Sequence, residues 1–167
     1  MYIQEAERLF EDAIRNNDVA TLAKFKEFGD TDRRQIHNFA HYDQYLKCGY
    51  SDKPSYDKYG RINNDIPKEK VQTQLLWEDG YATTMIEYFQ LPNGKWVVGL
   101  KWSLAESGGW YGCDMWSSQF LSKNEAIRHE LDFLKRQIER SSIKRDKIHM
   151  KDVDKARLEL RQLSLFG

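Results

Sequence analysis

The chain of 167 residues has few of the residues and segments that mark a special environment. Its two cysteines, Cys48 and Cys113, stand far apart and form no metal-binding or redox motif. Only three prolines are present, and no apolar run approaches the roughly 20 residues that cross a bilayer. Acidic residues interrupt the N-terminal stretch, which therefore does not resemble a signal peptide. These absences argue against a disulfide framework or a membrane protein and predict a soluble, cytoplasmic protein.

The sequence also lacks the local motifs of the common enzyme classes. There is no phosphate-binding glycine loop, nucleophile elbow, paired-carboxylate spacing or cysteine–histidine cluster. His37 and His41 have the i, i+4 spacing that can place two metal-binding imidazoles on one helix face. No glutamate base lies between them, and a zinc site would need a third ligand such as Asp32, Asp43 or His129. We therefore expect no cofactor and favour a binding protein over an enzyme.

The charge is balanced overall but unevenly distributed. The chain has 26 Lys and Arg against 26 Asp and Glu, giving a formal net charge of zero. From residue 121 onward, however, twelve basic residues stand against eight acidic ones. The basic surplus, concentrated in residues 135–161, either lies near a phosphate backbone or is the solvated face of a helix.

Apolar periodicity and turn residues predict an α+β fold. It consists of N-terminal helices, a four-stranded antiparallel β-meander and two C-terminal helices. Asp18, Thr31 and Ser122 are predicted to cap helices, with Glu125 at the spacing of a capping box. The predicted regions are helices at 1–48, a loop at 49–67, a sheet with a packed helix at 68–140, a helix at 141–161 and a tail at 162–167.

Residues 68–140 contain the clearest signal for a sheet. Apolar residues alternate along four segments, which are separated by turns rich in Gly, Asn and Asp. Five apolar residues of the third segment are expected on one face: Trp96, Val98, Leu100, Trp102 and Leu104. The strands are predicted at 71–77, 83–91, 96–104 and 110–116.

All five tryptophans lie within residues 77–116. Trp110, Tyr111 and Trp116 belong to the predicted fourth strand. An exposed aromatic surface of this kind can stack on bases or dock a protein. The alternative is that most of these rings lie under helices and belong to the core.

The sequence QLSLF at residues 162–166, near the end of the chain, resembles the pentapeptide by which bacterial DNA polymerases, repair factors and replication regulators dock on the DNA sliding clamp. At average amino-acid usage, a match to Q-L-[SD]-L-F arises by chance in roughly one chain of this length in several thousand. The match is therefore informative although it covers only five residues. The resemblance implies apolar anchors at Leu163, Leu165 and Phe166, directional hydrogen bonds from Gln162 and a small spacer at Ser164.

These features predict an accessory or adaptor protein that docks on the bacterial sliding clamp through its C-terminal peptide. It would act in DNA replication, repair or the maintenance of a mobile element such as a plasmid or phage. The expected partners are the clamp and either DNA or a host protein, with no membrane.

Three alternatives remain open. The protein could inhibit a host defence system through its aromatic sheet and the 49–67 loop. It could be a metal-dependent nucleic-acid enzyme that uses His37 and His41 and is targeted by its tail. The tail itself could instead close a helix, with Leu163 as its last core contact.

Overall fold

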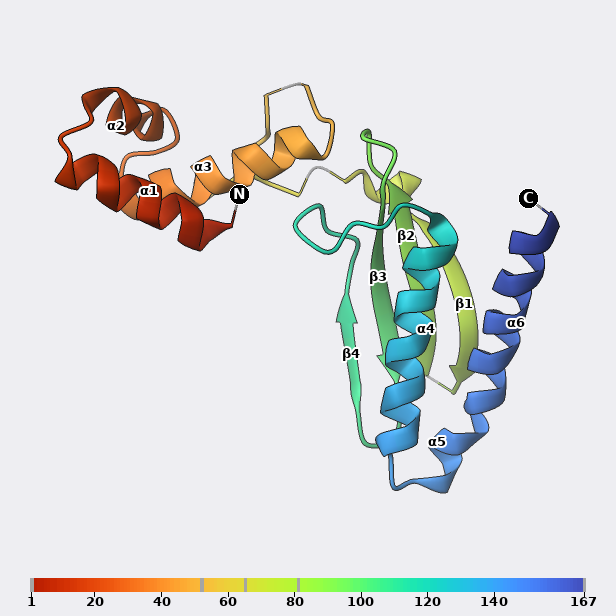
Figure 1. Cartoon of the computed structure of the whole chain (residues 1–167). Coiled ribbons are helices and arrows are strands. Elements are labelled where there is room, and N and C mark those ends of the chain that lie inside the picture. Colours follow the sequence, from red (N-terminus) through yellow and green to blue (C-terminus); the bar gives the residue numbers. More distant parts are fainter. Residues whose placement is uncertain (1, 52, 65, 81, 167) are drawn as a thin grey trace. The chain divides into compact units, whose positions relative to one another are not determined.

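A computed structural model describes residues 2–51, 53–64, 66–80 and 82–166, and only the backbone of residues 82 and 163–166. The chain divides into two compact units, Met1–Asp65 and Ile66–Gly167 (Figure 1). We call them the helical unit and the sheet unit and describe each by itself. The predicted α+β class is confirmed: N-terminal helices precede a four-stranded antiparallel sheet and C-terminal helices.

The described residues of the helical unit form three helices. Two of them begin at the predicted caps, because Asp18 Oδ1 accepts the Thr21 N–H at 3.0 Å and Thr31 Oγ1 accepts the Arg34 N–H at 3.4 Å. These bonds satisfy N–H groups that have no partner within the helix. A small aromatic core, with Phe25 fully buried, joins the three helices. They are α1 (Ile3–Arg15), α2 (Val19–Lys26) and α3 (Asp32–Lys47).

The sheet unit is a meander with strand order β1-β2-β3-β4, every pair antiparallel. A short 3-10 helix, η1 (Lys68–Lys70), precedes the sheet. Three helices follow it: α4 (Lys123–Arg140), α5 (Lys144–Ile148) and α6 (Met150–Phe166). The strands are β1 (Gln72–Asp79), β2 (Ala82–Gln90), β3 (Trp96–Ser103) and β4 (Gly108–Tyr111).

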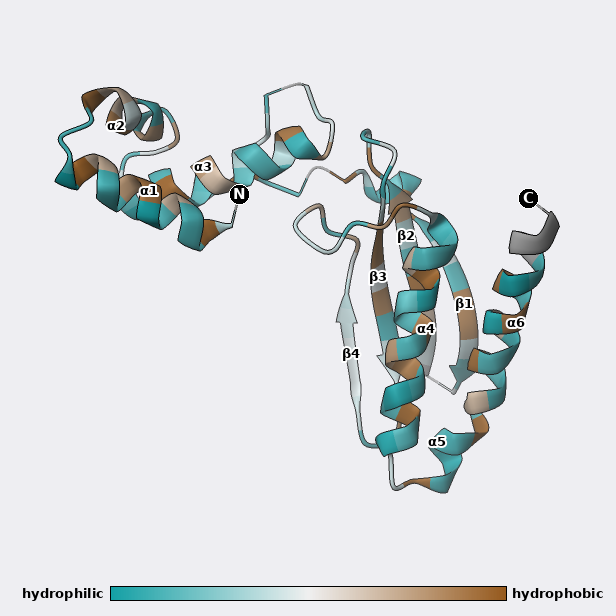
Figure 2. Cartoon of the chain, viewed as in Figure 1, coloured by the Kyte–Doolittle hydropathy of each residue, from teal (hydrophilic) through white to brown (hydrophobic). Residues whose placement is uncertain are grey.

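The core of the sheet unit lies between the sheet and α4 and α6 (Figure 1). The predicted alternation along the third strand is confirmed, because its five apolar residues all belong to this core or pack against it. Hydrophobic residues recur along α4 and α6 among hydrophilic ones (Figure 2). Burying each large apolar side chain stabilises the fold by ~1.5–3 kcal/mol. The helices contribute Ala126, Ile127, Leu131, Leu134, Ile138, Val153, Ala156 and Leu160.

Ser122 caps α4 as predicted, since its Oγ accepts the Glu125 N–H at 3.1 Å. The Glu125 carboxylate accepts a hydrogen bond at 3.1 Å from the N–H of Leu121, the residue before the cap. The capping box is therefore offset by one residue from its usual form. None of the described helices is both long and apolar enough to cross a membrane.

The fourth strand is shorter than the predicted 110–116 segment. Beyond Tyr111 the chain leaves the sheet, and Asp114 Oδ1 accepts the Trp116 N–H at 2.7 Å in a side-chain-stabilised turn. A close backbone approach accompanies this departure. A Cβ at Gly99 on β3 would lie 2.5 Å from the carbonyl carbon of Gly112, so only glycine fits there.

Candidate functional site

The pentapeptide, residues 162–166, has a helical backbone because α6 extends to Phe166. The helix thus continues past the boundary predicted at residue 161. Leu160 is the last described residue of α6 in the core, with 5% of its surface exposed. Gln162 is exposed. The side chains of Leu163, Ser164, Leu165 and Phe166 lie outside the described part, so their role in binding stays a prediction.

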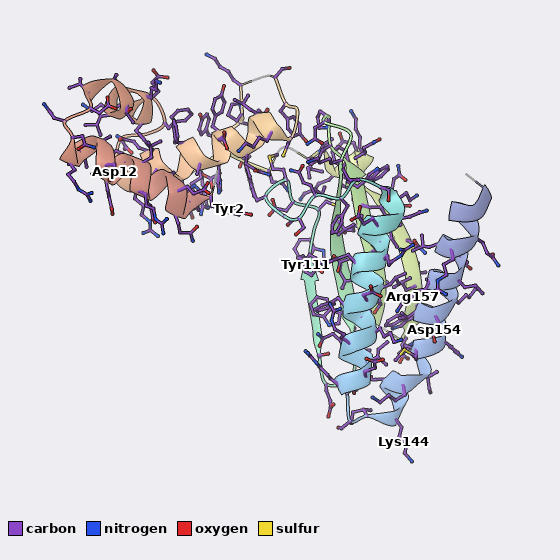
Figure 3. The ribbon with its side chains drawn as sticks, in the orientation of Figure 1. Tyr2, Asp12, Tyr111, Lys144, Asp154 and Arg157 are labelled. Atoms are coloured by element: carbon purple, nitrogen blue, oxygen red, sulfur yellow. The ribbon has the colours of Figure 1, made fainter. Side chains whose placement is uncertain are left out.

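Three arginines line a hollow of about 230 Å³ beside the start of the pentapeptide. Arg128 comes from α4, and Arg157 and Arg161 come from α6, with Leu160 completing the lining. Arg157 is labelled on α6 in Figure 3. Its Nη1 lies 3.0 Å from Asp132 Oδ1 and so connects α6 to α4. Three of the twelve basic residues counted from residue 121 onward therefore line one concave surface.

The aromatic residues predicted as an interaction surface lie in different surroundings. Strand pairing places Trp110 opposite Lys101 and Tyr111 opposite Leu100. Successive residues of a strand point to opposite faces, so Trp110 and Tyr111 do not share a surface. Trp110 is 68% exposed, whereas Tyr111 is 39% exposed and lies on the α4 side of the sheet, where its hydroxyl reaches Glu130 (Figure 3). Trp116 is half-buried in the loop after β4.

Tyr111 ties the edge strand to α4 through a buried carboxylate. Its hydroxyl donates a short hydrogen bond to Glu130, which is 1% exposed. Nδ1 of His129 lies 3.2 Å from the other oxygen of Glu130. Burial, followed by the hydrogen bond to Glu130, raises the pKa of Tyr111, so the phenol remains a proton donor at neutral pH. This group holds the sheet to the helix.

His37 and His41 lie together as their spacing predicts, with ring centroids 3.9 Å apart. Among the described residues, no group of three or more His, Cys, Asp or Glu side chains is arranged to hold a metal ion. Asp43, one proposed third ligand, pairs with Lys47 at 2.7 Å. Burial and the neighbouring His37 lower the pKa of His41 to about 4, so His41 is neutral at neutral pH.

His37 instead lines a pocket of about 430 Å³, which no local sequence pattern indicates. We call it the arginine pocket. One wall is the start of α3 and the other is a turn at residues 57–61. It is lined by Thr31, Arg33, Arg34, His37, Tyr59 and Arg61.

The amide of Asn38 holds the two walls of the arginine pocket together. Asn38 is fully buried, and its Nδ2 donates to the carbonyl oxygens of Phe28 and Gly60, both at 2.8 Å. Its Oδ1 accepts the Ile62 N–H at 3.2 Å. This part of the predicted 49–67 loop is therefore an anchored turn, with Gly60 in the left-handed region at φ +70°.

Comparison with known proteins identifies no relative. No protein-family model matches the chain, and neither curated proteins nor solved structures give a match. The features of the chain that indicate a function are the pentapeptide and the two arginine-lined surfaces.

Proposed function

We propose that this protein is an adaptor that docks on a bacterial DNA sliding clamp through the pentapeptide at residues 162–166. The observation that carries the proposal is the close match of these five residues to the clamp-binding pattern. On this basis the protein acts in DNA replication, repair or the maintenance of a mobile element. The rest of the chain supplies a second contact near DNA.

The position of the pentapeptide on α6 supports the proposal. The helix is anchored to the sheet unit through Val153, Ala156 and Leu160, and its next two residues are exposed. The segment that resembles a clamp ligand therefore begins directly after the last described core contact. Binding through Gln162 needs no disruption of the described core.

The arginine-lined hollow between α4 and α6 supports it as well. A clamp encircles DNA, so a docked protein works close to phosphates. Arg161, which lines this hollow, directly precedes Gln162. Basic side chains near the docking peptide would be attracted to the DNA backbone, and salt would weaken that attraction.

The expected affinity follows from the few anchors that the pentapeptide offers. Each large apolar side chain that enters a pocket contributes ~1.5–3 kcal/mol, and ordering the peptide opposes part of that gain. The balance corresponds to a dissociation constant on the order of micromolar. A ring with several equivalent sites would raise the apparent affinity.

A titration of purified bacterial clamp against the full chain tests the proposal. The double variant Gln162→Ala/Phe166→Ala removes the directional group and one anchor, and we expect it to weaken binding at least about tenfold. Leu158→Ala is the matched control. Leu158 lies on the same helix and is 55% exposed, but it stands outside the pentapeptide.

The control should bind like the wild type. Equal binding by the wild type and the double variant would contradict the proposal, and so would the absence of binding by both. Circular dichroism of each variant at the same concentration checks that the helices remain folded.

A further inference from the structure

The arginine pocket of the helical unit has three cationic side chains in its lining, two of them paired with carboxylates outside it. Three of its six lining residues are arginines, and no Asp or Glu is among the six. Its volume of about 430 Å³ is within the range of small-molecule sites, about 300–1,000 Å³. A pocket of this size and charge suits an anionic group that carries a ring or chain with it.

Two of the arginines are fixed in place before any ligand arrives. Arg34 forms an ion pair with Asp30. Its side chain also packs against Gly60, since a Cβ added to Gly60 would lie only 3.4 Å from Arg34 Cδ. Arg61 is bound by Asp57, which accepts from Nε at 2.9 Å and lies 2.8 Å from Nη2. Because these guanidinium groups are already ordered, little conformational entropy is lost when they bind an anion.

Arg33 differs from the other two arginines. Its side chain is exposed and forms no ion pair or hydrogen bond with the described residues. Its guanidinium is thus available to a ligand, and a planar guanidinium can bind a phosphate through two parallel hydrogen bonds.

The lining of the arginine pocket also includes His37 and Tyr59, which indicate a ligand larger than a simple anion. Nδ1 of His37 is buried and has no hydrogen-bond partner in the described part of the chain. Tyr59 is 57% exposed, and Lys58 Nζ and Arg61 Cζ lie over its ring, 5.0 Å and 5.2 Å from the centroid. Unpaired bases stack on exposed aromatic rings in positively charged surfaces.

We propose that the arginine pocket binds a phosphate of single-stranded nucleic acid, with the adjoining base stacked on Tyr59. Arg33, Arg34 and Arg61 contact the phosphate. Single strands are favoured over duplex because stacking on Tyr59 requires an unpaired base, whose face is available only in an unstacked strand. The proposal does not depend on the clamp, and its test contains no clamp.

Fluorescence anisotropy of a labelled single-stranded oligonucleotide with the full chain, at low salt, tests the proposal. Tyr59→Leu should weaken binding about five- to 150-fold, the range that loss of one stacked base produces, whereas Tyr59→Phe should retain it. Arg33→Gln should weaken binding at least about tenfold and lower the salt dependence by about one phosphate contact.

Arg8→Gln is the matched control, because Arg8 is an exposed arginine of the same unit outside the pocket. It should bind like the wild type. An equal loss in Arg8→Gln and Arg33→Gln would overturn the proposal, since it would show only general charge attraction. Unchanged binding by Tyr59→Leu or Arg33→Gln, or no binding by the wild type, would also overturn it.

Competition experiments identify the chemistry that the pocket recognises. A nucleoside monophosphate should displace the oligonucleotide more effectively than inorganic phosphate, and duplex of the same sequence should bind more weakly. Equal competition by phosphate and nucleotide, or equal binding of duplex, would contradict the stacked base.

Discussion

At the scale of single residues, buried polar side chains organise the irregular parts of the chain. Asn38 holds a turn that lies 22–24 residues away in the sequence. In the sheet unit, Asp146 is 2% exposed and accepts the Ala105 N–H at 2.9 Å and the Ser141 hydroxyl at 2.5 Å. Loss of such a group leaves buried partners unsatisfied, which costs about 1–3 kcal/mol for each. Neither residue stands out in the sequence.

We predict that His41 titrates far below a free histidine. Its pKa falls from 6.5 to about 4 in the folded chain, chiefly through burial and secondly through His37. The unfolded chain therefore binds a proton more readily than the native chain. The contribution of neutral His41 to the free energy of unfolding is complete above about pH 6.5 and is lost as the pH falls towards about 4.

An NMR titration of the four histidines measures this pKa directly. In His37→Gln the pKa of His41 should rise, because the neighbouring charge is gone, yet stay below 6.5 because burial remains. A wild-type His41 that titrates near 6.5 would contradict the prediction. So would a variant in which its pKa falls further.

At the scale of elements, local signals predicted the helices and strands well. Caps at Asp18, Thr31 and Ser122 depend on bonds that span three residues, and strand alternation is equally local. The arginine pocket could not be predicted in this way, because residues 31–37 and 59–61 are brought together by long-range contacts such as the Asn38–Gly60 hydrogen bond. The end of β4 was also predicted wrongly. The apolar sequence pattern continues past Tyr111, but the strand ends there and the chain turns at Asp114.

We predict that Gly99→Ala destabilises the sheet unit by about 1–3 kcal/mol, as overpacked sites generally do. The new Cβ would lie 2.5 Å from the Gly112 carbonyl carbon and 2.6 Å from the Tyr111 oxygen. These are backbone atoms, so a side-chain rotation cannot relieve the clash. Urea unfolding followed by tryptophan fluorescence measures the effect, because all five tryptophans lie in the sheet unit.

Gly112→Ala is the matched control for this clash. Its Cβ would meet only side chains, Glu87 Oε2 at 3.4 Å and Trp110 Cζ2 at 3.5 Å, which are ordinary contact distances. We expect its unfolding free energy to change by no more than about 0.5 kcal/mol. Equal stability of Gly99→Ala and Gly112→Ala would refute the close approach between β3 and the chain beyond β4.

At the scale of the whole molecule, the two proposals place two binding elements on one chain. The pentapeptide belongs to the sheet unit and the arginine pocket to the helical unit. When two weak binding elements are on one chain, binding by the first makes binding by the second intramolecular. The overall affinity for a target that carries both ligands rises if both elements can bind at once.

We therefore predict that a clamp loaded on DNA next to a single-stranded gap binds the chain at least about tenfold more tightly than the clamp alone. Arg33→Gln should remove this gain while retaining the affinity for the free clamp. Gln162→Ala/Phe166→Ala should retain only the affinity for the single strand. Surface plasmon resonance with immobilised loaded clamp measures all three, and an unchanged gain in Arg33→Gln would contradict the prediction.

We predict that both cysteine thiols are unreactive in the folded chain. Cys48 and Cys113 are buried, and burial, with the charge of Glu87 adding to it, raises the pKa of Cys113 to about 12. Only the thiolate form of a cysteine attacks thiol reagents, so neither side chain should react in the folded chain at neutral pH. A Leu158→Cys variant would then carry one reactive thiol in the folded state. A dye attached there would sit about one helical turn before Gln162.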